Sequence, residues 1–146
     1  MLFLTDIVIM LNKEQGVTNE EKIKYWVDLS NNDFVVAETL LKNGHNLYTG
    51  FMCHQAVEKL FKAYFTKVKN DTPPFKHDLE LLAQQSGLYE LLNEGQISFI
   101  EKLNPLNIEA RYPDYKNKLS QYLTNENTQS IFNQTKELLQ WIKEKI

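Results

Sequence analysis

The chain has 146 residues, a length typical of a single domain with one continuous core. Hydrophobic residues make up 42% and charged residues 24% of the chain, which excludes an intrinsically disordered protein and a membrane bundle. The formal net charge of -3 argues against adhesion to nucleic acid through a broad basic surface. Any contact with RNA must therefore be local, and recognition of a DNA sequence is not expected.

The single cysteine, Cys53, excludes an internal disulfide and a cysteine zinc site, so we expect the reducing cytoplasm as the location. Residues 1–19 form an expected apolar extension, and residues 20–146 form the expected domain. The extension is interrupted by Asp6 and lacks both a basic start and a small-residue cleavage site, so it is not read as a signal peptide. It is also too short to span a bilayer, and we expect it to pack on the domain or on a partner.

Two long helices are predicted in the first half of the domain. The first ends at Asn43-Gly44, a typical helix stop. The second runs from about Tyr48 to Val68. Its polar residues are expected on the solvent side, opposite an apolar stripe that ends with Val68. The stripe of the first helix is formed by Ile23, Trp26, Val27, Ser30, Phe34, Ala37 and Leu41, and the polar face of the second by Gln55, Lys59 and Lys62.

The second half of the domain shows three further helix patterns. A short helix is predicted from His77-Asp78 to Gly87, and another covers roughly Gln96 to Asn104. The stretch from Pro105 to Thr124 is expected to be irregular at first, because Pro113 and its flanking tyrosines do not continue a helix pattern. A final long helix follows Thr124-Asn125, which is a plausible cap.

No alternating strand pair, glycine-rich phosphate loop or internal repeat is present in the sequence. Three long helices and two short ones, joined by short connections, predict an all-α fold. The expected architecture is an antiparallel, up-and-down bundle of four to five helices.

The histidines do not have the spacing of a metal site, so neither a metal nor a cofactor is expected. His54 lies on or beside the apolar stripe of its helix, where a packed, hydrogen-bonded histidine is favoured over a catalytic or ligand-binding one. His77 and Asp78 precede a helix, and capping by Asp78 is favoured there over binding of a phosphate, which Asp78 would repel.

The most distinctive run in the chain surrounds Arg111, the sole arginine. A guanidinium flanked by Tyr112 and Tyr115 suits a bidentate grip on a phosphate or carboxylate, together with stacking on a base. The alternative is an ion pair of Arg111 with Asp114 or Glu109 that fixes a Tyr-Pro turn. The residues alone leave both interpretations open.

Over about Glu20 to Ile146 the chain resembles the HEPN family. The resemblance rests on the order and spacing of four segments, which are Tyr25-Trp26, Phe51–Lys59, Lys76–Leu79 and Ala110–Pro113. It implies a helical bundle that usually forms a homodimer. It also implies a small nucleotidyltransferase as partner, in a system of the toxin-antitoxin kind, and a nucleotide or RNA as ligand.

RNA-cleaving members of the family carry an arginine followed, after four to six residues, by a histidine. Here Arg111 is followed by Lys116, Asn117 and Lys118 at those positions, and no histidine follows Arg111 anywhere in the chain. The resemblance therefore implies an incomplete catalytic pair. The interpretation leans toward a protein that is not an enzyme.

Two functional interpretations follow from this resemblance. The favoured one is a non-catalytic module that binds a nucleotide or a nucleotidyltransferase partner. The alternative is a metal-independent endoribonuclease in which Arg111 acts with a non-standard base, His54. The expected ligand-binding residues are Arg111, Tyr112, Asp114, Tyr115, Lys59 and His77.

Overall fold

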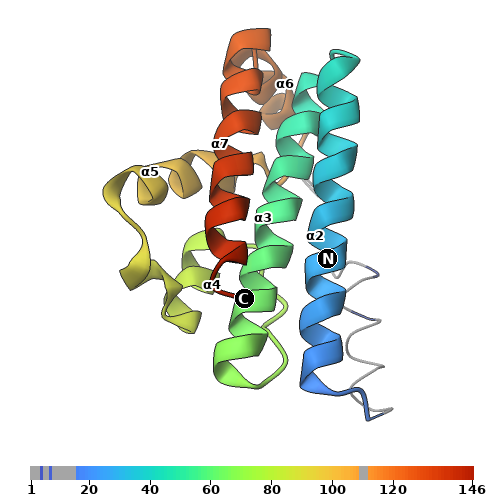
Figure 1. Cartoon of the computed structure of the whole chain (residues 1–146). Helices are drawn as coiled ribbons and strands as arrows, with labels where there is room; N and C mark the ends of the chain where they lie inside the picture. The colour runs from blue at the N-terminus through green and yellow to red at the C-terminus, as the bar shows by residue number, and fades with distance from the viewer. Residues whose placement is uncertain (1–3, 5–6, 8–15, 109–111) are drawn as a thin grey trace.

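The computed structural model describes residues 4, 7, 16–108 and 112–146, and every regular element in these ranges is a helix. The all-α bundle is therefore confirmed. Its three long helices lie side by side (Figure 1). They are α2 (Asn19–Lys42), α3 (Asn46–Lys69) and α7 (Asn125–Lys143). The described ranges contain no helix that is both long enough and apolar enough to cross a membrane.

The directions of the long helices differ in part from the predicted antiparallel order. α2 and α3 form an antiparallel hairpin, but α7 runs in the same direction as α3 (Figure 1). Asn46, at the start of α3, donates to the Leu123 carbonyl just before α7, and Lys67 near the end of α3 donates to the carbonyl of Ile146. The two helices are parallel because the shorter elements between them carry the chain back along the bundle.

Local signals place both ends of α2, and its end at Asn43-Gly44 is the one that the sequence predicted. The Thr18 hydroxyl accepts a hydrogen bond from the Glu21 N–H at 3.2 Å and caps the start of the helix. Asn43 ends it, and Gly44 then takes a left-handed φ of 77°, which lets the chain reverse into α3. Inside the hairpin, the Ser30 hydroxyl donates to the Ala56 carbonyl at 2.7 Å.

The prediction of a polar face for α3 was wrong. Every residue from 53 to 64 is buried, including Gln55, Lys59 and Lys62, because α2, α4, α7 and the η2 turn surround this helix. Val68, predicted on the buried stripe, lies instead at the exposed end of the helix. α3 is therefore the central helix, and its charged side chains need partners inside the protein.

Short elements connect α3 to α7. The helix α4 (Leu79–Ser86) begins after Asp78, whose carboxylate accepts from the Leu81 N–H, and ends at Gly87 with a φ of 81°, as predicted. The helix α5 covers Glu94–Leu103. The 3-10 turns η1 (Leu88–Leu91) and η2 (Asn104–Leu106) precede and follow α5.

A helix that the sequence reading missed, α6 (Pro113–Tyr122), precedes α7. Pro113 starts this helix instead of interrupting it, because a proline in the first turn leaves no N–H that the helix would need. None of its ten residues is buried, and its few apolar residues, of which Leu119 packs against the core, give only a weak helix pattern. Leu123 after it is buried and packs near Gly50 of α3, where an added Cβ would lie 3.3 Å from the leucine side chain.

The boundary between the apolar extension and the domain, predicted at residue 20, stays a prediction.

The packing around α3 predicts a large loss of stability when its core side chains are truncated. Phe61 is completely buried in the described core. Phe61→Ala should lower the free energy of unfolding by about 3–5 kcal/mol, measured by urea denaturation. Val35→Ala on α2, where 63% of the residue is exposed, serves as the control and should change stability by less than about 0.5 kcal/mol. Equal stability of the two variants would contradict the central position of α3.

Candidate functional site

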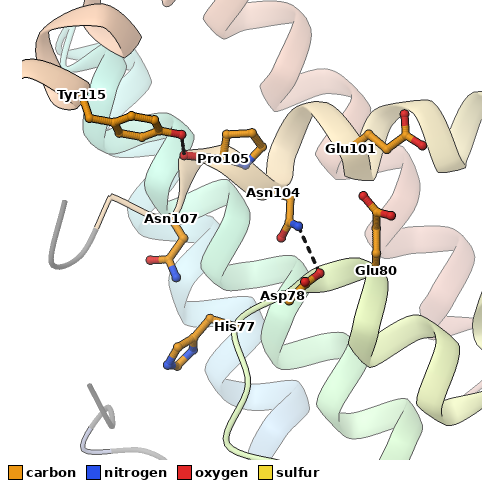
Figure 2. A pocket seen from close by; sticks show the side chains of 8 residues that line it. All are labelled: His77, Asp78, Glu80, Glu101, Asn104, Pro105, Asn107 and Tyr115. Carbon is orange, nitrogen blue, oxygen red and sulfur yellow. Dashed lines mark hydrogen bonds between the residues drawn. The ribbon is translucent and has the colours of Figure 1, made fainter.

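A cavity of about 480 Å³ opens between the start of α4, the end of α5 and the start of α6. Figure 2 shows the side chains that line it. Its size lies within the range of small-ligand sites, about 300–1,000 Å³. The lining residues are His77, Asp78, Glu80, Glu101, Asn104, Pro105, Asn107 and Tyr115.

The structure brings two of the predicted ligand-binding residues, His77 and Tyr115, to this cavity. Tyr112 and Asp114 lie at the start of α6 and are exposed, and 83% of Tyr112 is accessible to solvent. Arg111, predicted as the main anion-binding residue, lies outside the described residues, as does Glu109. In the chain Arg111 directly precedes Tyr112, which is the residue before α6.

Hydrogen bonds hold the walls of the cavity together. The Asn104 amide donates to Asp78 Oδ1 at 3.1 Å, and its oxygen accepts from the Leu79 N–H at 2.9 Å (Figure 2). These two bonds attach the end of α5 to the start of α4. The Tyr115 hydroxyl donates to the Pro105 carbonyl at 3.0 Å, which attaches α6 to η2.

His77 is held in the cavity wall by a carboxylate buried beneath it. Its Nδ1 lies 3.1 Å from both carboxylate oxygens of Glu58, and its side chain keeps 22% of its surface exposed, whereas Glu58 has none. Lys62 Nζ lies 3.4 Å from the same carboxylate and His54 Nδ1 lies 3.9 Å from it, both from fully buried side chains. We call Glu58, His77, Lys62 and His54 the buried charge cluster.

Electrostatics assign charge states within the cluster. Burial raises the pKa of Glu58, but the hydrogen bond from His77 and the positive charge of Lys62 outweigh it, so the pKa is lowered. Burial lowers the pKa of His54 from 6.5 to about 4, and the attraction of Glu58 offsets only part of this effect. At neutral pH Glu58 is ionised, and His54 is an uncharged side chain in the core.

The placement of His54 counts against the catalytic role considered for it. The side chain is fully buried, whereas the sequence predicted a position at the edge of the core, and its pKa of about 4 makes it a weak base. The histidine that lines the cavity is His77.

Lys59, another predicted ligand-binding residue, does not line the cavity. Its Nζ lies 2.9 Å from Asp33 Oδ2 on α2 and 3.0 Å from Gln55 Oε1. Burial raises the pKa of Asp33, although the charge of Lys59 acts in the opposite direction. This pair helps to hold α2 against α3.

Sequence reasoning missed Glu58, Lys62 and Asn104. A signal for the first two was present, since His54, Glu58 and Lys62 recur at intervals of four residues and therefore share one face of a helix. Nothing local marked Asn104, because its partners Asp78 and Leu79 are far away in the sequence.

The charge of the cavity restricts what it can hold. Asp78, Glu80 and Glu101 contribute three carboxylates, and no lysine or arginine of residues 16–108 and 112–146 lines it. Figure 2 shows Glu80 and Glu101 on one side of the cavity, with His77 and Asn107 on the other. These carboxylates repel a phosphate and accept hydrogen bonds from hydroxyl or amino groups. In the described part of the chain, no three His, Cys, Asp or Glu side chains come together as metal ligands.

The burial of His54 predicts that stability falls in mild acid. Its pKa is about 4 in the folded protein and 6.5 ordinarily, so the unfolded chain binds more protons as pH drops below 6.5. Stability should therefore be full above about pH 7 and fall by up to about 3 kcal/mol as pH drops toward 4. The lowered pKa of Glu58 adds a further loss below about pH 4.5.

Urea denaturation at about pH 7.5 and about pH 5 measures this dependence on pH. His54→Gln should reduce the difference between the two conditions, whereas His45→Gln, at an exposed position, should leave it unchanged. A His54→Gln protein with the same pH dependence as the wild type would contradict the assignment.

The comparison with known protein families agrees with this helical architecture. The HEPN domain family matches residues 23–146. This range includes the buried charge cluster and all the residues that line the first cavity. No curated protein and no solved structure matches the chain. Because the family match covers most of the chain, this protein belongs to the HEPN domain family.

Proposed function

We propose that this protein is a non-catalytic, nucleotide-binding module that acts as a homodimer with a small nucleotidyltransferase, in a system of the toxin-antitoxin kind. Membership of the HEPN family supports a role connected with nucleotides or RNA. The observation that carries the proposal is the cavity of about 480 Å³, which His77 and Tyr115 help to line. Arg111 and Tyr112 come shortly before Tyr115 in the sequence.

The charges around the cavity suggest how a nucleotide binds. Phosphate is repelled by the carboxylates of Glu80 and Glu101 and attracted by a guanidinium, so Arg111 is assigned to the phosphate. The exposed ring of Tyr112 beside it is available for stacking on a base. The carboxylates then accept hydrogen bonds from ribose hydroxyls or base amino groups.

The lack of catalysis is supported by the histidines. The positions where the family has its histidine hold Lys116, Asn117 and Lys118, and His54 is buried and uncharged at neutral pH. A buried, uncharged imidazole has no access to a ribose hydroxyl in the solvent-exposed cavity.

Exposed Val35 and Val36 on α2 offer an apolar surface that suits a partner or a second copy.

Nucleotide binding can be tested by thermal shift and calorimetry. A nucleotide at 100 times its dissociation constant should stabilise the fold by about 2.7 kcal/mol. Arg111→Ala should abolish the stabilisation, because it removes the guanidinium assigned to the phosphate. Arg111→Lys should weaken it, since an ammonium cannot form the bidentate pair. Lys118→Ala, an exposed cation on α6, is the matched control and should bind like the wild type.

Two outcomes would contradict this proposal. Stabilisation that is equal in the wild type and in Arg111→Ala would move the phosphate away from Arg111. The absence of a shift with all common nucleotides would leave only binding to a protein partner. That partner can be sought by co-expression with an adjacent nucleotidyltransferase gene and by light scattering of the product.

An endoribonuclease is the second candidate, and the geometry of His77 is the observation that favours it. The ionised carboxylate of Glu58 can only accept, so Nδ1 of His77 carries the proton that it shares with Glu58. In the neutral ring Nε2 is then the atom able to take a proton from a ribose 2′-hydroxyl. The Arg111 guanidinium would stabilise the charge that develops on the phosphate.

Cleavage of labelled RNA in the presence of a chelator distinguishes the two candidates. The non-catalytic proposal predicts no cutting by the wild type above that of Arg111→Ala. The controls are His77→Gln and His54→Gln, which separate the histidine in the cavity wall from the one in the core. Cutting that is lost in Arg111→Ala and in either histidine variant would overturn the non-catalytic proposal and identify the base.

A further inference from the structure

A second cavity, of about 440 Å³, lies between the first half of α5 and the last turns of α7. The first cavity is lined by the end of α5 and this one by its start, so the two lie toward opposite ends of the same helix. None of the residues predicted to bind a ligand lines it. Its lining consists of Asn93, Gly95, Gln96, Phe99, Gln134, Glu137, Leu138 and Trp141.

One part of this cavity is apolar. Phe99 and Leu138 are almost completely buried, with 4% and 3% of their surfaces exposed, and Trp141 is partly exposed beside them. Gly95 adds no side chain at the start of α5, and an added Cβ there would lie 3.3 Å from Asn93 Oδ1. An aromatic ring beside two buried apolar side chains suits a flat ligand that stacks.

The α5 side of the cavity supplies hydrogen-bond donors. Asn93 and Gln96 form a capping box, in which Asn93 Oδ1 accepts from the Gln96 N–H at 2.8 Å and Gln96 Oε1 accepts from the Asn93 N–H at 2.9 Å. Both side-chain oxygens are therefore used by the backbone. The remaining polar groups of the two side chains are their NH₂ groups, which only donate.

The α7 side supplies acceptors. Gln134 Nε2 donates to the Ser130 hydroxyl at 3.0 Å and to the Ser130 carbonyl at 3.4 Å. Because a carbonyl can only accept, these bonds fix the amide orientation and leave Gln134 Oε1 as the acceptor. Glu137, one turn along the helix, adds two carboxylate oxygens and is the only charged residue among the described residues that line the cavity.

We propose that this second cavity binds an uncharged, flat heterocycle that carries an amino group next to a ring acceptor, as cytosine, adenine and guanine do. The ring stacks on Trp141 against the apolar part of the cavity. Its acceptors face the NH₂ groups of Asn93 and Gln96, and its amino group donates to Gln134 and Glu137. A phosphate is disfavoured there, because Glu137, the only charged residue among the described residues that line the cavity, is negative. Lys145 Nζ, which does not line the cavity, lies 4.4 Å from the centroid of the Trp141 ring, so the ligand stacks on the other face of that ring.

Tryptophan fluorescence is a direct measurement of this binding. The chain contains two tryptophans, and Trp26 is only 1% exposed, so quenching by a ligand reports on Trp141. Cytidine, adenosine and guanosine should quench saturably, whereas uridine, which has no amino group, should bind about ten-fold more weakly. Nucleosides without phosphate separate this site from the proposed nucleotide site, so Arg111→Ala should leave the quenching unchanged.

Matched variants test the assigned acceptors. Glu137→Gln should weaken cytidine binding by about ten-fold, because a hydrogen bond to a charged group is replaced by one to a neutral group. Glu126→Gln, at an exposed position on the same helix and outside the cavity, should bind like the wild type. Circular dichroism melts of both variants establish that the fold is kept.

Four results would overturn the proposal. The first is the absence of saturable quenching by any nucleoside, and the second is equal binding of uridine and cytidine. The third is equal weakening by Glu137→Gln and Glu126→Gln. The fourth is loss of quenching in Arg111→Ala, which would assign the binding to the first cavity instead of the second cavity.

Discussion

The rest of the structure depends on the burial of one carboxylate, that of Glu58, in the middle of α3. Because α2, α4, α7 and η2 surround this helix, Glu58, Lys59 and Lys62 in its middle are buried and must be paired within the protein. Glu58 finds Lys62 one turn along the same helix and His77 in the segment before α4. The contact with His77 joins the central helix to the wall of the candidate site.

Such a cluster contributes more to geometry than to stability. Removing ions from water costs several kcal/mol for each ion, so a buried pair is often no more stabilising than apolar residues of the same size. The cluster does, however, fix one arrangement, since Glu58 contacts His77 through both of its oxygens. The imidazole of His77 is thereby oriented at the cavity, while His54, four residues before Glu58, stays uncharged in the core. Two histidines near one carboxylate therefore have different environments, and only one of them lines a cavity.

The sequence predicted those parts of the fold that are encoded by neighbouring residues. Asp78 and Thr124 cap their helices through hydrogen bonds over three residues, and such signals can be recognised without tertiary structure. The burial of Lys59 and Lys62 was not predictable in this way, because the elements that cover them come from all parts of the chain. α6 was missed for a different reason, since none of its residues is buried and only a few of them are apolar, so the helix pattern is weak. Of the site, the sequence indicated His77 and Tyr115, but the pairing of Asn104 with Asp78 depends on the fold.

The two cavities share a physical origin in the way α5 is attached. At its start the capping box uses the oxygens of Asn93 and Gln96, and just beyond its end Asn104 bonds to Asp78 and to the Leu79 N–H. In both places amide side chains satisfy backbone groups that a helix end leaves unpaired, so their orientation is set by the fold before any ligand arrives. A polar group that is already oriented loses less entropy when a ligand binds than a mobile one does. The bonds of Asn93 and Gln96 at the start of α5 and those of Asn104 to the start of α4 therefore pre-organise part of the polar lining of both cavities. For this reason recognition is expected at these two places and not on the long helices.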